Sequence, residues 1–270
     1  MRGASRDAAI VGKNALASAV AGGADTNALA EDLFAVASVL DTNSTLRRAL
    51  AEPASPTEAK RAVVQRLFSG KVGSATEQLL SDLVAQRWSS DLDLPSTVDT
   101  LGVQAVLSSA EKAGRLQQVE DELFRFDQIV ADSPELEDAV TNRQSTPAAK
   151  AAIIDRLLQG KSAPETERLA RQAVLAPRGQ KFASRVTSML KAAAERRDQL
   201  TAIVTTATEL DQAQRARLAA SLQSLYGKQV QIQTVIDPQV IGGLKVAIGD
   251  EVIDGTVARK LDSARQHLAG

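Results

Sequence analysis

The sequence predicts a mostly α-helical protein, in which two similar helical bundles are followed by a small α+β domain. Three observations predict this fold class. Apolar residues recur at helical spacing through roughly the first 199 positions, the pattern repeats 90 residues later, and the apolar period falls to two after Leu200. We therefore expect a first bundle over residues 1–115, a second bundle with a connecting helix over 116–199, and the α+β domain over 200–270.

The composition favours helix-on-helix packing and argues against several kinds of site. Of the 270 residues 44% are apolar but only 3% are aromatic, so the cores must consist of Ala, Leu, Val and Ile. The formal net charge of −1 predicts no strong attraction to nucleic acid or anionic lipid. The absence of cysteine excludes disulfides and thiolate chemistry, and no apolar run reaches the roughly 18 residues of a membrane span. We expect no catalytic residue, cofactor, metal or nucleic acid, and no direct membrane insertion.

The first bundle is expected to contain a series of short amphipathic helices. In the first of them, Ile10, Val11, Leu16 and Val20 lie on one broad stripe, and Gly22-Gly23 ends it. Thr26 is a candidate cap for the second. The expected ranges are 7–21, 26–40, a short helix ending before Pro53, a helix from Pro56 that carries Val63, Val64, Leu67 and Phe68 inward until Gly70, 76–88, and a longer helix opening at Pro95 or Ser96.

The pattern then restarts with an internal repeat. Without gaps, residues 31–84 overlay residues 121–174 with 16 identities in 54 positions, where composition alone gives about four. Identical pairs include Leu33-Phe34 with Leu123-Phe124, and Gly70-Lys71 with Gly160-Lys161. We interpret this as the duplication of a helical bundle.

The C-terminal part mixes strands with helices. A connecting helix over 180–199 precedes a strand over 200–206. Asp211 and Gln214 predict a capped helix that Gly227 ends, and the alternation around Ile232 predicts a second strand.

The stretch from Asp237 to Thr256 predicts a bend, a strand, a tight turn, a second strand and a helix start. Pro238 removes a backbone donor and favours extended backbone before it, and Gly242-Gly243 permits backbone angles that a side chain would block. Gly249-Asp250 fits a hairpin turn, and Asp254 can cap a final helix over 257–268. The motif positions are Asp237, Pro238, Gly242, Gly243, Gly249, Asp250, Asp254 and Gly255.

This stretch resembles the C-terminal signature of the delta subunit of rotary ATP synthases, the oligomycin-sensitivity-conferring protein of mitochondria. The family pattern is D-P-x-x-x-G-G, an apolar alternating strand, G-D or G-N, an apolar residue and D-x-S. Thr256 stands where Ser is usual. Delta subunits are typically shorter, with one helical bundle and a small C-terminal domain. A doubled bundle therefore explains the length of the chain, as in the long form of actinobacterial relatives.

The resemblance implies a non-catalytic subunit that joins the catalytic head of a proton-translocating ATP synthase to its peripheral stalk and resists rotor torque. In the family, the helical bundle binds the N-terminal segments of alpha subunits, and the C-terminal domain binds the b subunit. It implies a peripheral position on the cytoplasmic face of the bacterial plasma membrane. Because the alpha segment lies between the first and fifth helices of the bundle, the resemblance points to Leu16, Val20, Leu80 and Val84 as partner-binding residues.

Other candidate sites have structural interpretations that outweigh the functional ones. Trp88 is a core-edge residue or an interface anchor. Gly160-Lys161-Ser162 lacks the first glycine of a phosphate-binding loop and fits a helix end. Asp91 with Asp93 provides few ligands for a cation, and the single histidine, His267, has no catalytic partners nearby.

Two alternative functions stay open at this point. The repeat alone is compatible with a helical adaptor unrelated to ATP synthase, which would retain neither alpha nor b subunits. A small-molecule enzyme built on the C-terminal domain would instead show a nucleotide- or metal-induced melting shift.

Overall fold

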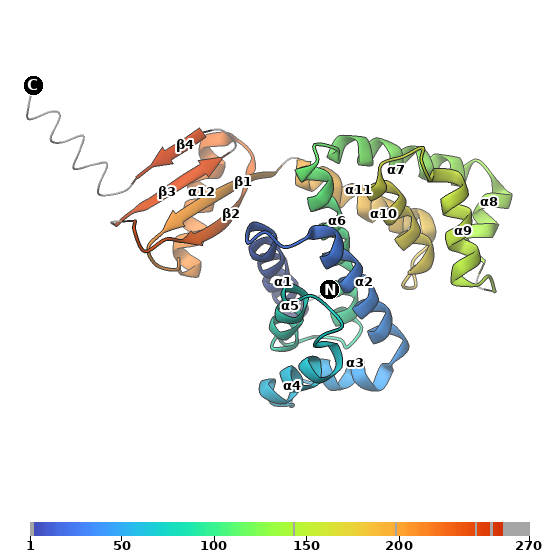
Figure 1. The fold of residues 1–270 in the computed structure, drawn as a ribbon, viewed down its shortest axis with the longest axis horizontal. Coiled ribbons are helices and arrows are strands. Elements are labelled where there is room, and N and C mark those ends of the chain that lie inside the picture. The colour runs from blue at the N-terminus through green and yellow to red at the C-terminus, as the bar shows by residue number, and fades with distance from the viewer. Residues whose placement is uncertain (1–2, 143, 198, 241, 249–250, 256–270) are drawn as a thin grey trace, which may run out of the picture. The chain divides into compact units, whose positions relative to one another are not determined.

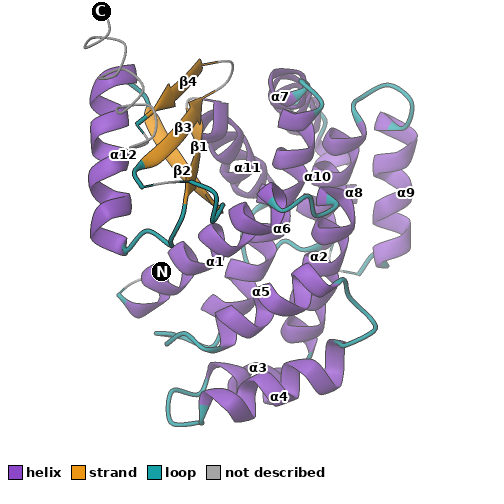
Figure 2. Cartoon of the chain, turned by 60° about the vertical axis from the view of Figure 1, so that its left-hand side comes forward, coloured by secondary structure: helices purple, strands orange, loops and turns teal. Residues whose placement is uncertain are grey.

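The structure, a computed structural model, describes residues 3–255 apart from residues 143, 198, 241, 249 and 250. Contacts divide the chain into two compact units, Met1–Ala194 and Glu195–Gly270. The described part contains twelve α-helices and one four-stranded sheet, which confirms the predicted fold class. Figures 1 and 2 show the helices of the first unit and the small sheet of the second.

The first bundle, as the name is used here, comprises six helices, and all six were predicted. Their bounds are α1 (Ala4–Ala21), α2 (Thr26–Thr42), α3 (Ser44–Ala51), α4 (Thr57–Phe68), α5 (Ser74–Val84) and α6 (Asp93–Lys112).

Helix starts follow the capping chemistry of the neighbouring residues. Asp25, and not Thr26, caps α2, because its carboxylate accepts hydrogen bonds from the backbone nitrogens of Asn27 (2.9 Å) and Ala28 (3.2 Å). A carboxylate is favoured there by the free N–H groups and by the helix dipole. Helix α6 begins before Pro95, which fits the first turn because backbone N–H groups there have no intrahelical partner.

Two side chains depart from the predicted inward faces. Ile10 lies off the buried stripe of α1 and is exposed, while Ala8, Gly12 and Leu16 are buried. Leu67 of α4 is also exposed, contrary to the prediction. Small residues decide the inner face of α1, because they permit close helix approach, and apolar spacing alone gives them little weight.

Helix α6 lies at the centre of the helical unit. It is buried on nearly every side and contacts α1, α2 and α3 as well as α7 and α10 of the second bundle. A Cβ atom added to Gly102 would lie 2.6 Å from the ring of Phe34, so this glycine permits the close approach of α2. Figure 1 shows α6 between the two groups of helices.

The second bundle repeats the first at a constant offset. Its helices are α7 (Leu116–Ala131), α8 (Pro134–Thr141), α9 (Pro147–Leu158), α10 (Pro164–Leu175) and α11 (Phe182–Arg197). Helices α7 to α10 begin 90 residues after α2 to α5, as 116 − 26, 134 − 44, 147 − 57 and 164 − 74 show. A single cluster of buried apolar residues, from Ala8 to Ala193, runs through both bundles.

Within each bundle, a carboxylate of one helix holds the first turn of another. Asp32 of α2 accepts hydrogen bonds from the Gly73 backbone nitrogen and from Thr76 Oγ1, both at 2.8 Å. Ninety residues later, Glu122 of α7 accepts the corresponding bonds from α10, at 2.8 and 2.6 Å. Each carboxylate satisfies backbone and side-chain donors at a helix start, where negative charge is also favoured by the dipole.

In its described residues, the second unit contains a four-stranded sheet and the helix α12. It consists of β1 (Gln199–Thr206), α12 (Gln212–Tyr226), β2 (Gln229–Ile236), β3 (Leu244–Ile248) and β4 (Glu251–Asp254), in the strand order β2-β1-β3-β4. Strand β1 pairs in parallel with β2 and antiparallel with β3, and β3 pairs antiparallel with β4.

The helix of this unit begins and ends as predicted. Asp211 and Gln214 form a capping box, with backbone-to-side-chain bonds of 2.7 and 3.0 Å, and Gly227 ends the helix at a φ of 67°. Leu222 of α12 packs with buried residues of β1 and β3. The predicted final helix over 257–268 lies outside the described residues.

Candidate partner-binding surfaces

The motif that carries the family resemblance connects β2 to β3. The Asp237 backbone nitrogen donates to Thr206 O (2.9 Å), and its side chain accepts from the Gln239 nitrogen (2.9 Å), which fixes the bend before Pro238. Gly242 and Gly243 have φ values of 64° and 79°, in the left-handed region that favours glycine.

The end of the motif closes the β3–β4 hairpin. The Gly255 nitrogen donates to Leu244 O (3.0 Å), directly after Asp254, the last residue of β4. Gly249 and Asp250, the predicted turn, lie outside the described residues. The described part of the motif therefore makes turns and strand pairs, which is a structural task.

The predicted partner-binding residues lie together, on and beside α1 and α5. These two helices contact each other along the first bundle. Leu16, Leu80 and Val84 are buried between helices, while Val20 is partly buried at the edge of the core. Trp88 is also buried, and its Nε1 donates to Leu83 O at 3.1 Å, so it closes the end of α5. On this helix pair, a partner would meet Val20 and exposed residues such as Ile10 first.

The sheet of the second unit has one face that α12 does not cover and that carries several exposed apolar side chains. Ala202 and Val204 of β1 point into the α12 side, so Ile203 points to the opposite face. There Ile203 lies opposite Ala247, which lies opposite Val252. Ile203 is 43% exposed and Val252 is 53% exposed, and Val235 of β2 is exposed on the same face. This surface was not predicted from the sequence. The signal for it is the alternation in β1, where Ile203 lies between the inward residues Ala202 and Val204.

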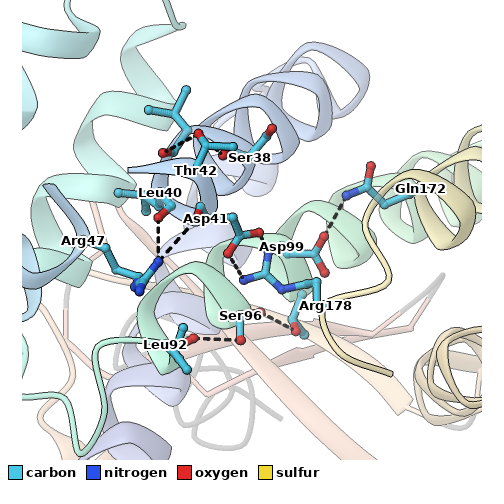
Figure 3. A network of polar contacts seen from close by, with 12 residues as sticks. Ser38, Leu40, Asp41, Thr42, Arg47, Leu92, Ser96, Asp99, Gln172 and Arg178 are labelled. Atoms are coloured by element: carbon cyan, nitrogen blue, oxygen red, sulfur yellow. Dashed lines mark hydrogen bonds and ion pairs between the residues drawn. The ribbon is translucent and has the colours of Figure 1, made fainter. Parts of the chain in front are cut away.

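A layer of ion pairs joins the two bundles. Arg178, in the loop after α10, donates to both carboxylate oxygens of Asp41 in α2, at 2.5 and 2.9 Å (Figure 3). Arg168 of α10 pairs with Glu31 of α2. A further pair lies within the second bundle, where Arg115, the residue before α7, donates to Glu165 of α10 at 2.6 and 3.1 Å.

The most deeply buried pair belongs to this layer. Asp99 of α6 accepts from Gln172 Nε2 of α10 (2.7 Å, Figure 3) and pairs with Arg185 of α11. Asp99 and Arg185 are both buried. Because a buried charge is costly unless it is paired, this cluster fixes one arrangement of α6, α10 and α11.

Two carboxyl groups in this region have lowered pKa values. Burial opposes ionisation of Glu165, but hydrogen bonds and charge from Arg115 outweigh it, and the net pKa is lowered. Burial likewise opposes ionisation of Glu122, and the bonds from Thr166, Gln118 and the Ala163 nitrogen bring its pKa below the ordinary 4.5. Both groups therefore act as carboxylates that hold helices, which is a structural use of charge.

The remaining candidates have structural surroundings. Gly160 has a φ of 72° after α9, and its nitrogen donates to Glu167, as expected for a helix end. Asp91 pairs with Arg47 at 2.9 Å. Within the described ranges, no group of three or more potential metal-ligating side chains occurs. His267 lies outside the described residues.

Two helical bundles joined by ion pairs, followed by a small sheet domain, define a class of mostly helical proteins in which the described charged side chains hold helices together. Comparison with known sequences gives the family. The family model described as "ATP synthase delta (OSCP) subunit" matches residues 14–94 and 103–268. The chain therefore belongs to the ATP synthase delta (OSCP) family, whose members are non-catalytic structural subunits, as the resemblance predicted.

Relatives named "ATP synthase subunit delta" match over most or all of the chain. The one from Nocardia farcinica is 43% identical over 270 residues and covers 100% of both chains. Those from Streptomyces griseus and Streptomyces avermitilis are 44% and 42% identical, over 91% and 99% of this chain and 91% and 98% of their own. A chain of the Toxoplasma gondii mitochondrial ATP synthase hexamer is 20% identical, with a TM-score of 0.27 over 62% of this chain and 95% of its own.

Proposed function

We propose that this chain is a stator subunit of a proton-translocating ATP synthase, which links alpha subunits of the catalytic head to the b subunit of the peripheral stalk. The observation that carries the proposal is the division into two compact units, a helical one and a sheet domain, each with its own candidate surface. A linker under torque needs two separate binding surfaces, here called grips. It transfers no chemical group.

The N-terminal segments of alpha subunits bind along α1 and α5 of the first bundle. Val20 and its exposed neighbours make the contact, and Leu16, Leu80, Val84 and Trp88 support it from beneath. The equivalent helices of the second bundle are α6 and α10. Helix α6 is enclosed by other helices, and α10 is paired to α2, so the first bundle offers the more open surface.

The b subunit binds the sheet face of the second unit that α12 does not cover. Ile203, Ala247, Val252 and Val235 together form an apolar surface that a helix can cover. Exposed apolar surface of this kind typically marks a protein interface.

The second bundle arose by duplication and stiffens the joint. The constant offset of helix starts supports this, and the two segments matched to the family, 14–94 and 103–268, are separated within α6. The domain divisions 1–115, 116–199 and 200–270 then describe two copies and a tail, with α6 serving both copies. Ion pairs between the bundles make them one arm.

The protein works as a peripheral component on the cytoplasmic face of the plasma membrane and takes part in ATP synthesis and hydrogen ion transport. None of the helices that the structure describes has the length and apolar character of a membrane span. Attachment to the membrane therefore comes from the b subunit.

The two grips can be tested separately with the full-length chain. We expect Ile203→Asp to weaken binding to the soluble part of the b subunit by about tenfold, the effect of one central interface residue. Binding to heads stripped of this subunit should not change. Leu225→Asp, on an exposed position of α12, is the matched control. Failure of the unmodified chain to bind either partner would favour an unrelated adaptor.

A further inference from the structure

The first bundle binds an arginine of the second through a pair of residues on α2. The Arg168 guanidinium carbon lies 4.3 Å from the centre of the Phe34 ring, and its Nη2 donates to Glu31 Oε2 at 3.1 Å. Phe34 is only 4% exposed. Glu31 and Phe34 are three residues apart, so they lie on the same side of α2. A carboxylate beside an aromatic face is a good site for a guanidinium, which can pair and stack at once.

Helix α7 carries the same pair of residue types 90 positions later. Asp121 and Phe124 correspond to Glu31 and Phe34. Both are exposed, and Phe124 is 54% exposed. Among the described residues, neither has an ion pair or a ring contact. The pair that α10 covers in the first bundle is thus uncovered in the second.

The difference between the two phenylalanines has a physical cause. Phe34 lies against Gly102 of α6, where any side chain would clash with its ring. The corresponding residue of α11 is Ala192, and α11 does not pack against α7 as closely as α6 packs against α2. In addition, α10 covers Phe34, whereas α11 is followed by β1, and none of the described helices provides a third copy of α10. In the described chain, Phe124 therefore has neither the close glycine of a neighbouring helix nor the arginine-bearing helix that Phe34 has.

A second carboxyl group lies beside Phe124 on α7. Asp127 is three residues further along the helix, so Asp121 and Asp127 flank the ring on one side of α7. In the described part of the chain, Asp127 Oδ1 is buried without a hydrogen-bond partner, and burial raises the pKa of this carboxyl. A cation docked beside Phe124 would stabilise both carboxylates. This acidic and aromatic surface favours a cationic partner.

We propose that the Asp121–Phe124–Asp127 surface of α7 binds an arginine-bearing helix of another subunit of the ATP synthase, in the way that α2 binds α10. The proposal rests on family membership and not on the assignment of the two grips. Arginine fits better than lysine, because its planar group stacks on a ring while it pairs with a carboxylate. In a second copy of this chain, Arg168 already pairs with its own Glu31, so self-association would need a different arginine.

The first experiment is photocrosslinking within the purified ATP synthase. A p-benzoylphenylalanine at position 124 should crosslink to a helical segment of a different subunit, with an arginine within one turn of the attachment point. The matched control is the same substitution at Ile129, which is 53% exposed on another side of α7. No crosslinking above that control, attachment to a second copy of this chain, or attachment to a segment without arginine would overturn the proposal.

The second experiment measures affinity for complexes stripped of this subunit. We expect Phe124→Ala and Asp121→Asn each to weaken rebinding by about fivefold, the range of a stacked and paired arginine. Ile129→Ala should leave it within about twofold. Exchanging the charges of Asp121 and the crosslinked arginine should restore affinity. If the unmodified chain does not rebind, the proposed stator function fails, whereas normal rebinding of both variants contradicts only this inference.

Discussion

At the scale of single residues, glycines inside helices decide how closely the helices approach. A Cβ at Gly102 would lie within 2.6 to 3.1 Å of three atoms of the Phe34 ring. Gly102→Ala should therefore destabilise the helical unit by about 1–3 kcal/mol, the cost of overpacking a core. Chemical denaturation monitored by circular dichroism measures it. Gly73→Ala is the control, because its Cβ would make only an ordinary contact of 3.5 Å. Equal stability of both variants would contradict this account.

A second residue-scale prediction concerns the buried cluster at Asp99. Asp99→Asn leaves the buried Arg185 without its charged partner, so we expect a loss of about 3–5 kcal/mol in the free energy of unfolding. Replacing both residues, as in Asp99→Asn with Arg185→Met, should recover part of that loss, because no buried charge is left unpaired. A double variant less stable than the single one would show that the pair itself, and not the orphaned charge, accounts for the effect.

At the scale of helices and strands, the carboxylate contacts between elements predict a dependence on pH. The folded pKa of Glu122 is lowered, so its stabilising contribution is present above its ordinary value of 4.5 and is lost as the pH falls through the folded pKa. Glu122→Gln should remove part of the stability loss that occurs as the pH falls below 4.5. Melting temperatures across that range measure it, with the exposed Glu58→Gln as the control. An unchanged acid profile in Glu122→Gln would refute the role of this contact.

Elements with local sequence signals could be predicted, whereas features that depend on tertiary contacts could not. Helices α2 to α5 and the capping box of α12 have local signals, namely apolar spacing and capping residues, and their existence is confirmed. The details differ, because Asp25 and not Thr26 caps α2, and α5 ends at Val84 and not at 88. The exposure of Ile10 and the enclosure of α6 depend on which helices meet, which local spacing does not contain. The arginine pairs between bundles also escaped prediction, because their members are up to 137 positions apart.

The candidate surfaces were predictable only in part. The resemblance pointed to α1 and α5, and the structure places those helices side by side, but it buries Leu16, Leu80 and Val84. A sequence resemblance gives the helices and not the exposed side chains, since exposure depends on tertiary packing. The outer sheet face and the exposed Phe124 became visible only through strand register and through comparison of the two bundles.

At the scale of the whole molecule, the continuous core predicts that the two bundles unfold together. Leu169 of α10 is fully buried in the cluster that runs from Ala8 to Ala193. Leu169→Ala should cost about 2–5 kcal/mol and should lower amide protection in α2 and α6 as much as in α7 and α10. Hydrogen exchange measured by mass spectrometry resolves these segments. Protection in β1 and β3 should not change, because those strands belong to a separate core. The reciprocal variant, Leu222→Ala in α12, should lower protection in the sheet alone. If Leu169→Ala loosened only α7 to α11, the bundles would be two independent modules, and the stiff arm inferred for the stalk joint would have a hinge between them.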